Sequence, residues 1–190
     1  MPIHLIIGPM FSGKTTALIN TYRQYCDLYR VDNLLLVNHA MDAERYLADE
    51  ILTHDNDSEK CCGVNSLYEI QFDARQYKAI FVNEAQLFDR LSEWVLQQVD
   101  LNDNLDIFLC GLDSDFKRER FGELLDLIPY ATSVQKLQGR CSTEGCTTPS
   151  LFTHRLTSDT AQVVIGTDNY IPVCRRCYEY HNKSNQIKDK

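Results

Sequence analysis

Apolar residues gather into short unbroken runs along the chain, and between these runs they recur at wider, helix-like spacing. Unbroken runs are typical of strands buried in a parallel sheet, whereas the spaced pattern is typical of helices that pack on such a sheet. This alternation predicts an α/β fold in which a parallel sheet carries helices on both faces. The predicted strands cover residues 3–7, 33–37, 77–82, 105–110 and 133–137.

The first helical pattern lies between the first two predicted strands. Leu18, Tyr22, Tyr25 and Tyr29 recur at helical spacing, which places them on one face of a helix that ends near Arg30. Large side chains on one helix face usually contact the core. We therefore predict that this face is buried against the sheet.

Two later segments differ from each other in pattern. Residues 91–99 are amphipathic, with Leu91, Val95 and Val99 on one face, and predict a second helix. Residues 39–66 are polar and mixed, which indicates a mobile loop that is helical in part.

Composition and charge narrow the class of protein. Hydrophobic residues make up 44% of the 190-residue chain and charged residues 24%, as in an ordinary globular domain with room for a small appendage. No apolar stretch approaches the roughly 20 residues of a membrane span, and no leader precedes the first strand. The net charge of −8 argues against a nucleic-acid surface, which needs clustered Lys and Arg. We therefore expect a cytoplasmic protein that acts on a small substrate, without a membrane or nucleic-acid partner.

A glycine-rich motif directly follows the first predicted strand. It has the spacing G-x-x-x-x-G-K-[ST] and stands between a strand and a helix, which is the context that a phosphate-binding loop requires. Backbone N–H groups of such a loop surround a polyphosphate, the lysine reaches the terminal phosphates, and the final hydroxyl binds Mg²⁺. The residues predicted to bind a nucleoside triphosphate are Gly8, Pro9, Met10, Phe11, Ser12, Gly13, Lys14 and Thr15.

The predicted strand 77–82 ends in Asn83 and Glu84. In phosphate-loop proteins a carboxylate at this strand end holds Mg²⁺, but here the first position is an asparagine, which offers an oxygen without a charge. Glu84 supplies a carboxylate one residue later and can act as general base on an attacking hydroxyl. A surface glutamate on a strand-to-helix turn is the alternative, and the phosphate loop upstream favours the catalytic role.

Four of the eight cysteines form two close pairs near the C-terminus. Such a set matches the tetrahedral, sulfur-rich coordination of a structural Zn²⁺ ion. Disulfides are the alternative, which a reducing compartment disfavours. The predicted zinc ligands are Cys141, Cys146, Cys174 and Cys177. The scattered cysteines, interpreted as structural, are Cys26, Cys61, Cys62 and Cys110.

The segment 147–173 connects the two cysteine pairs. With both ends held by one metal, it can fold over a substrate at a small entropic cost. A strand that merely packs on the main domain is an equally good interpretation of its sequence. Because composition shifts at Gly139, we predict a nucleotide-binding domain over 1–139 and a zinc-binding domain over 140–190.

Together these motifs resemble the thymidine kinase family of the small, zinc-containing type. The phosphate loop Gly-Pro-Met-Phe-Ser-Gly-Lys is far narrower than the general motif, and Asn83-Glu84-Ala85-Gln86 stands where the family has Asp-Glu-x-Gln. The segments 111–116 and 164–170, Phe121-Gly122 and the four cysteines complete the resemblance. It implies a RecA-like phosphate-loop domain followed by a zinc lasso, and transfer of the γ-phosphate of ATP to the 5′-hydroxyl of thymidine.

The resemblance also implies a role for individual residues. Catalysis falls to Glu84, Lys14 and Arg45, and Mg²⁺ binding to Thr15 and Asn83. Besides the loop, ATP contacts fall to Asn83, Glu84, Ala85 and Gln86. The implied thymidine pocket comprises Met10, Leu87, Phe116, Phe121, Thr153, Gln162, Val163, Val164, Ile165, Gly166 and Tyr170. The implied assembly is a homotetramer with structural Zn²⁺, and feedback inhibition by thymidine triphosphate is expected.

Three departures from the family pattern bear on function. Asn83 replaces an aspartate, Leu87 stands where phenylalanine is common, and the spacer from Cys141 to Cys146 is wider than usual. The uncharged Asn83 keeps a catalytically weak nucleotide-binding protein as an alternative. A zinc-ribbon ATPase that acts on nucleic acid is another alternative, which the acidic charge and the short chain disfavour.

Overall fold

The computed structural model describes residues 2–43, 50–52, 58–71, 73–164 and 167–188. Its centre is a six-stranded sheet with the order β5-β2-β6-β7-β1-β8, and every neighbouring pair is parallel. The strands are β1 (Ile3–Gly8), β2 (Leu34–His39), β5 (Cys62–Val64), β6 (Ala79–Val82), β7 (Asp106–Leu112) and β8 (Ser133–Lys136). The five predicted strands are confirmed, with shifts of a few residues at their ends, although the residues of β8 are exposed.

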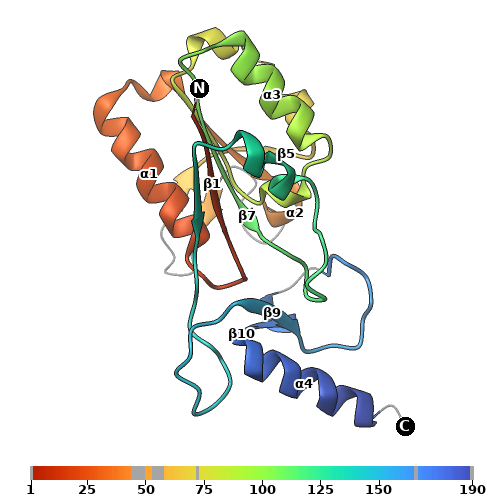
Figure 1. The fold of residues 1–190 in the computed structure, drawn as a ribbon. Coiled ribbons are helices and arrows are strands. Elements are labelled where there is room, and N and C mark those ends of the chain that lie inside the picture. The colour runs from red at the N-terminus through yellow and green to blue at the C-terminus, as the bar shows by residue number, and fades with distance from the viewer. Residues whose placement is uncertain (1, 44–49, 53–57, 72, 165–166, 189–190) are drawn as a thin grey trace.

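Helices cover both faces of the sheet, as predicted (Figure 1). Helix α1 (Lys14–Leu28) packs on one face, and α3 (Leu91–Leu101) packs on the other. Alternation along β1 separates the two cores, because Leu5 belongs to the α3 side and Ile6 to the α1 side. The face predicted for the second helix is confirmed: Leu91, Val95 and Val99 are buried.

The remaining elements outside the C-terminal part are short. They are α2 (Ala40–Ala43), the antiparallel hairpin β3 (Glu50–Leu52) with β4 (Ser58–Lys60), and the 3-10 turns η1 (Val31–Asn33), η2 (Leu67–Glu69), η3 (Ala74–Gln76), η4 (Ala85–Leu87) and η5 (Leu124–Tyr130). The prediction of a loop over 39–66 is therefore wrong for β3, β4 and β5. Each of these strands is only three residues long, so none contains an apolar run of the kind by which the others are recognised.

The predicted buried face of the first helix is wrong at its end. Tyr29 is 41% exposed, because α1 stops at Leu28 and the backbone of Tyr29 is extended. Tyr25 is partly buried, and its hydroxyl donates to the Asp106 carboxylate at 2.6 Å. Burial and this hydrogen bond raise the pKa of Tyr25, so its hydroxyl stays protonated and ties α1 to β7.

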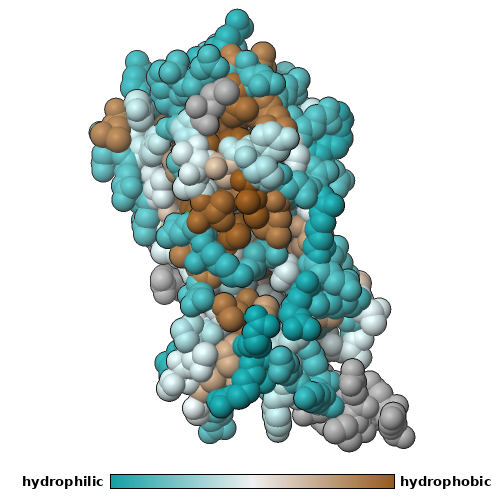
Figure 2. Space-filling view, in the orientation of Figure 1, coloured by the Kyte–Doolittle hydropathy of each residue, from teal (hydrophilic) through white to brown (hydrophobic). Residues whose placement is uncertain are grey.

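The C-terminal part is a small unit below the sheet in Figure 1. It contains the antiparallel pair β9 (Phe152–Arg155) and β10 (Tyr170–Val173), the turn η6 (Thr167–Asn169) and helix α4 (Arg175–Lys188). Its buried hydrophobic cluster consists of the four paired cysteines with Val173 and Tyr178. Figure 2 shows apolar surface gathered over the sheet half, whereas this lower half is mostly hydrophilic.

Within the described ranges, no helix is both long enough and apolar enough to cross a membrane.

Candidate functional site

The phosphate loop joins the end of β1 to the start of α1. Gly13, the residue before the helix, adopts a left-handed conformation with φ 81°, which glycine reaches without steric cost. The loop is tightened by the Ser12 hydroxyl and the Lys14 ammonium, which both donate to the Pro9 carbonyl at 2.8 Å. Backbone N–H groups at a helix start and a nearby ammonium form a site suited to polyphosphate.

Asn83 lies at the end of β6, opposite the loop, and is fully buried. The Thr15 hydroxyl donates to Asn83 Oδ1 at 3.3 Å, and Asn83 Nδ2 donates to Asn38 Oδ1 at 3.0 Å. Because Asn38 accepts from the amide nitrogen, the amide oxygen of Asn83 faces Thr15. Two oxygen atoms therefore lie side by side, and oxygen is the ligand type that Mg²⁺ takes, directly or through its waters.

Glu84 directly follows Asn83 and has a left-handed backbone, with φ 50° and ψ 39°. Its carboxylate accepts from Gln86 Nε2 at 2.6 Å, and Gln86 Oε1 accepts from the Leu112 N–H at 3.0 Å. Gln86 is thus a bridge between the ends of β6 and β7. Gly122 makes room for it, because a Cβ at that position would lie 2.1 Å from the Gln86 carbonyl oxygen. The carboxylate of Glu84 is therefore held by a buried side chain.

A cleft runs from the phosphate loop to the C-terminal unit. Its phosphate wall is formed by residues 10–16 with Glu84 and Gln86. Its C-terminal wall is formed by Leu112, Ser114, Asp115, Phe116 and Phe121 together with Thr153, Gln162, Val163, Val164 and Tyr170. The described pocket residues from sequence all line it: Met10, Leu87, Phe116, Phe121, Thr153, Gln162, Val163, Val164 and Tyr170. Asn83 and Ala85 are buried beside the cleft rather than in its lining, as are Gly8 and Pro9. Arg45, Ile165 and Gly166 lie outside the described residues.

Sequence reasoning missed several residues that line the cleft. Thr16, Met41, Leu52, Leu112, Ser114 and Asp115 belong to it. Leu112, Ser114 and Asp115 belong to the segment 111–116, whose resemblance to the family could have identified them as site residues. Met41 and Leu52 come from the polar segment without a readable pattern.

Hydrogen bonds connect residues 153–164 of the C-terminal wall to the phosphate loop and to the segment that follows β7. The Met10 N–H donates to Thr153 Oγ1 at 3.0 Å, which connects the phosphate loop to β9. Gln162 Nε2 donates to Asp115 Oδ2 at 3.0 Å. Asp115 is buried and also accepts from the N–H groups of Lys117 and Glu119. These contacts bring together residues that are far apart in the sequence.

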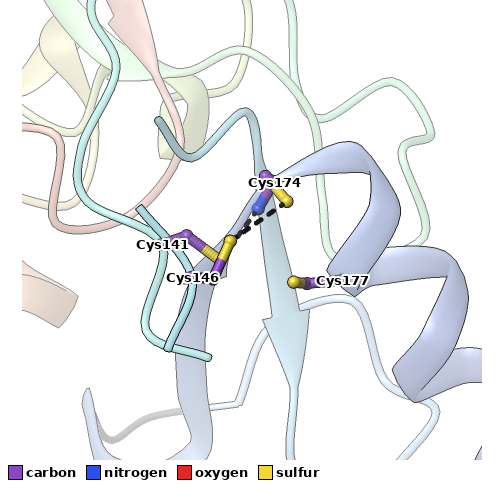
Figure 3. A group of neighbouring side chains, drawn as sticks. All are labelled: Cys141, Cys146, Cys174 and Cys177. Atoms are coloured by element: carbon purple, nitrogen blue, oxygen red, sulfur yellow. Dashed lines mark hydrogen bonds between the residues drawn. The ribbon is translucent and has the colours of Figure 1, made fainter. Parts of the chain in front are cut away.

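The paired cysteines meet as predicted. Their sulfur atoms all lie within 4.8 Å of one another, and all four residues are buried. Figure 3 shows the thiols pointing toward a common centre, with Cys141 and Cys146 from one loop, Cys174 after β10 and Cys177 on α4. The distance from Cys146 Sγ to Cys174 Sγ is 3.8 Å, as expected for tetrahedral ligands about 2.3 Å from zinc.

The electrostatics of this cluster also fit a cation. A backbone hydrogen bond from Thr148 lowers the pKa of Cys146 to about 6. The Thr143 hydroxyl lowers the pKa of Cys177, but burial and the neighbouring thiols raise it to about 11. The structure has all four as free cysteines, and four thiols this close together fit zinc, which would hold them as thiolates.

Comparison with known proteins decides the family. The family model described as thymidine kinase matches residues 1–178. The chain belongs to the thymidine kinase family. Its relatives include the thymidine kinase of Oryza sativa subsp. japonica, 38% identical over 182 residues, and the cytosolic thymidine kinase of Gallus gallus, 34% identical over 178 residues.

Coverage differs among these thymidine kinases. Both alignments include 93% of this chain, which spans 65% of the rice protein and 76% of the chicken protein. The thymidine kinase of Choristoneura biennis entomopoxvirus is 32% identical, and its alignment covers 97% of this chain and all of the viral protein.

Proposed function

We propose that this chain transfers the γ-phosphate of ATP to the 5′-hydroxyl of thymidine. The observation that carries the proposal is the cleft, whose lining includes residues 10–16 of the phosphate loop, the aromatic side chains of Phe116 and Phe121, and Glu84. This set of residues supports the binding of a phosphate donor next to a nucleoside acceptor, with a carboxylate available to the reacting hydroxyl.

The phosphate wall holds ATP. Backbone N–H groups of the loop and the start of α1 bind the phosphates, and Lys14 exchanges the Pro9 carbonyl for the terminal phosphates. Thr15 and Asn83 are the residues that hold Mg²⁺, which neutralises phosphate charge when bound. Asn83 contributes through its oxygen, and Asn38 is what keeps that oxygen directed at Thr15.

Glu84 is the general base. Its carboxylate takes the proton of the 5′-hydroxyl as that oxygen attacks the γ-phosphorus, and the β–γ bridging oxygen leaves with ADP. Gln86 donates to one carboxylate oxygen and thereby fixes the direction in which Glu84 accepts the proton.

The C-terminal wall holds thymidine. Phe116 and Phe121 provide apolar faces for the base, and the segment that includes residues 162–164 provides backbone groups for its polar edge. A site that hydrogen-bonds to the polar edge of the base rejects bases with other donors and acceptors, because buried unpaired donors and acceptors are costly. Zinc at the four cysteines anchors the part of this wall that follows residue 139, where the zinc-binding domain begins, whereas Phe116 and Phe121 belong to the nucleotide-binding domain.

Three further properties are proposed from family resemblance. They are a homotetrameric assembly, feedback inhibition by thymidine triphosphate and a cytoplasmic location. Each concerns the whole protein, and none is needed for the chemistry above.

The decisive experiment incubates the protein with γ-labelled ATP, Mg²⁺ and thymidine. Label in thymidine monophosphate supports the proposal. Release of labelled phosphate that depends on added DNA would indicate a nucleic-acid ATPase instead. Tight ATP binding without turnover would indicate a nucleotide-binding protein, the alternative that the uncharged Asn83 raises.

A further inference from the structure

Arg155 is a buried guanidinium behind the C-terminal wall. It ends β9, directly opposite Tyr170 in the register of the hairpin, and is only 3% exposed. It contributes no atom to the lining of the cleft, yet it touches residues that do. Its position is therefore one layer away from any bound molecule.

Every hydrogen bond of this guanidinium goes to a neutral oxygen in the described part of the chain. Nη1 donates to the carbonyls of Asp159, at 3.0 Å, and of Ala161. Nη2 donates to the Gln162 carbonyl at 3.0 Å and to the Tyr170 hydroxyl at 2.5 Å. One side chain thus gathers the backbone of residues 159–162 and ties it to β10.

The flat face of the guanidinium stacks on aromatic rings. The Arg155 Cζ atom lies 3.6 Å from the centre of the Phe116 ring and 5.0 Å from that of Tyr170. The Tyr170 hydroxyl in turn donates to the Val164 carbonyl at 3.3 Å. Phe116, Gln162, Val164 and Tyr170, all of which line the cleft, are therefore connected through one charged group.

Burying this charge is costly for folding. A guanidinium loses its hydration when it is buried, and carbonyl oxygens compensate less well than a carboxylate does. Arg155 Nε is also buried, and it has no hydrogen-bond partner among the residues that the structure describes. An apolar side chain would avoid both costs, but it would hold neither the carbonyls nor the stacked ring. The buried arginine is therefore explained by a need to fix the positions of these groups.

We propose that Arg155 is a positioning residue for the nucleoside, which fixes Phe116, Tyr170 and the 159–164 backbone as one rigid wall. This inference rests on the proposed function and names a determinant of its substrate site. Arg155 acts through these neighbours and takes no part in phosphate transfer.

Arg155→Lys tests the idea because it keeps the charge and removes the planar fork. An ammonium cannot donate to four oxygens at once or stack flat on Phe116. The matched control is Arg90→Lys, since Arg90 also stacks on a ring, that of Tyr68 at 4.5 Å, but lies outside the cleft lining. Steady-state kinetics and equilibrium dialysis of labelled thymidine are measured well below the melting temperature of each variant.

We expect Arg155→Lys to raise the thymidine KM and Kd by roughly tenfold, the equivalent of about 1.4 kcal/mol. The ATP KM should change by less than about twofold, because the phosphate wall is untouched. The control should match the wild type in all three constants. A general loss of structure would instead change the constants for both substrates or the zinc content.

Phe116→Leu supplies a second measurement. If Arg155 acts through the Phe116 ring, the double variant should bind thymidine more tightly than the product of the two single effects allows. Simple multiplication of the effects, or an unchanged thymidine KM in Arg155→Lys, would overturn the inference. Failure of the proposed function would look different, because the wild type itself would then neither bind nor phosphorylate thymidine.

Discussion

The two walls of the cleft are stabilised in different ways. The phosphate wall consists of strand ends and a helix start that are anchored in the large cores on the two faces of the sheet. The C-terminal wall is supported by a small cluster made largely of cysteines, by one buried guanidinium, and by a few hydrogen bonds to the phosphate loop and to the segment after β7. One wall is supported by distributed apolar packing, the other by a handful of strong point contacts.

This difference predicts how each wall fails. Distributed packing spreads the loss of one contact over many neighbours, whereas a wall that depends on point contacts loses its shape when one is removed. Changes in the C-terminal unit should therefore affect thymidine selectively. Changes at the strand ends should affect phosphate chemistry.

The largest effect is expected from Glu84→Gln, at the junction of the walls. The amide keeps the shape but cannot accept the proton, so kcat should fall by roughly 10²–10⁴ while ATP and thymidine still bind. Rapid-quench kinetics and isothermal titration separate these quantities. Normal turnover would show that Glu84 is not the base.

Removal of zinc should be next in size. Chelation under reducing conditions should raise the thymidine Kd by roughly tenfold or more, because each residue that must be re-ordered costs about 1–2 kcal/mol. The ATP Kd should stay near that of the intact protein, and limited proteolysis should now cut between residues 141 and 177. An unchanged thymidine Kd after zinc removal would contradict the idea that a few point contacts support the C-terminal wall.

Asn83→Asp tests the phosphate wall. A carboxylate binds Mg²⁺ more strongly than an amide, so the Mg²⁺ concentration for half-maximal ATP binding should fall, by roughly tenfold at most. Asn38 must then turn its amide to donate to the new oxygen, because its present contact is Oδ1. Asn104→Asp adds the same charge at an exposed position and serves as control. An unchanged or higher requirement would falsify the assignment of Asn83.

The smallest effect is expected from Thr153→Val. It removes the acceptor of the Met10 N–H and should raise the thymidine KM by about fivefold, as for the loss of one buried hydrogen bond of about 1 kcal/mol. Thr21→Val is the control, because it deletes a hydroxyl bonded within α1, outside the cleft lining. If the two variants have equal kinetics, the hydrogen bond of Thr153 does not contribute to the connection between the walls.

Local pattern accounts for the part of the fold that the sequence predicts well. Apolar runs identify the strands that are buried on both faces, and fixed spacing identifies the phosphate loop and the cysteine cluster. Each of these features is recognisable because it depends on residues close together in the sequence or on the residue types that a ligand requires. The three-residue strand β5 has neither, and the sequence did not predict it.

The role of Arg155 has no such signal. The residue acquires its partners because β9 and β10 pair in a register that places it opposite Tyr170, and because Phe116 arrives from the end of β7. Register across a long hairpin and contacts between distant segments follow from the complete fold. The same holds for the Asn38–Asn83 pair, which joins β2 to β6.

The backbone conformation of Phe11 and Glu84 has a consequence for which substitutions accumulate at these positions during evolution. Both line the cleft with positive φ, at 60° and 50°, a conformation that costs a side-chain-bearing residue about 1–2 kcal/mol. Glycine or asparagine would relieve that cost at either position. Selection for stability alone, in a background where activity is not required, should therefore replace these two residues early. If both residues are retained despite this conformational cost, their retention indicates selection for catalysis.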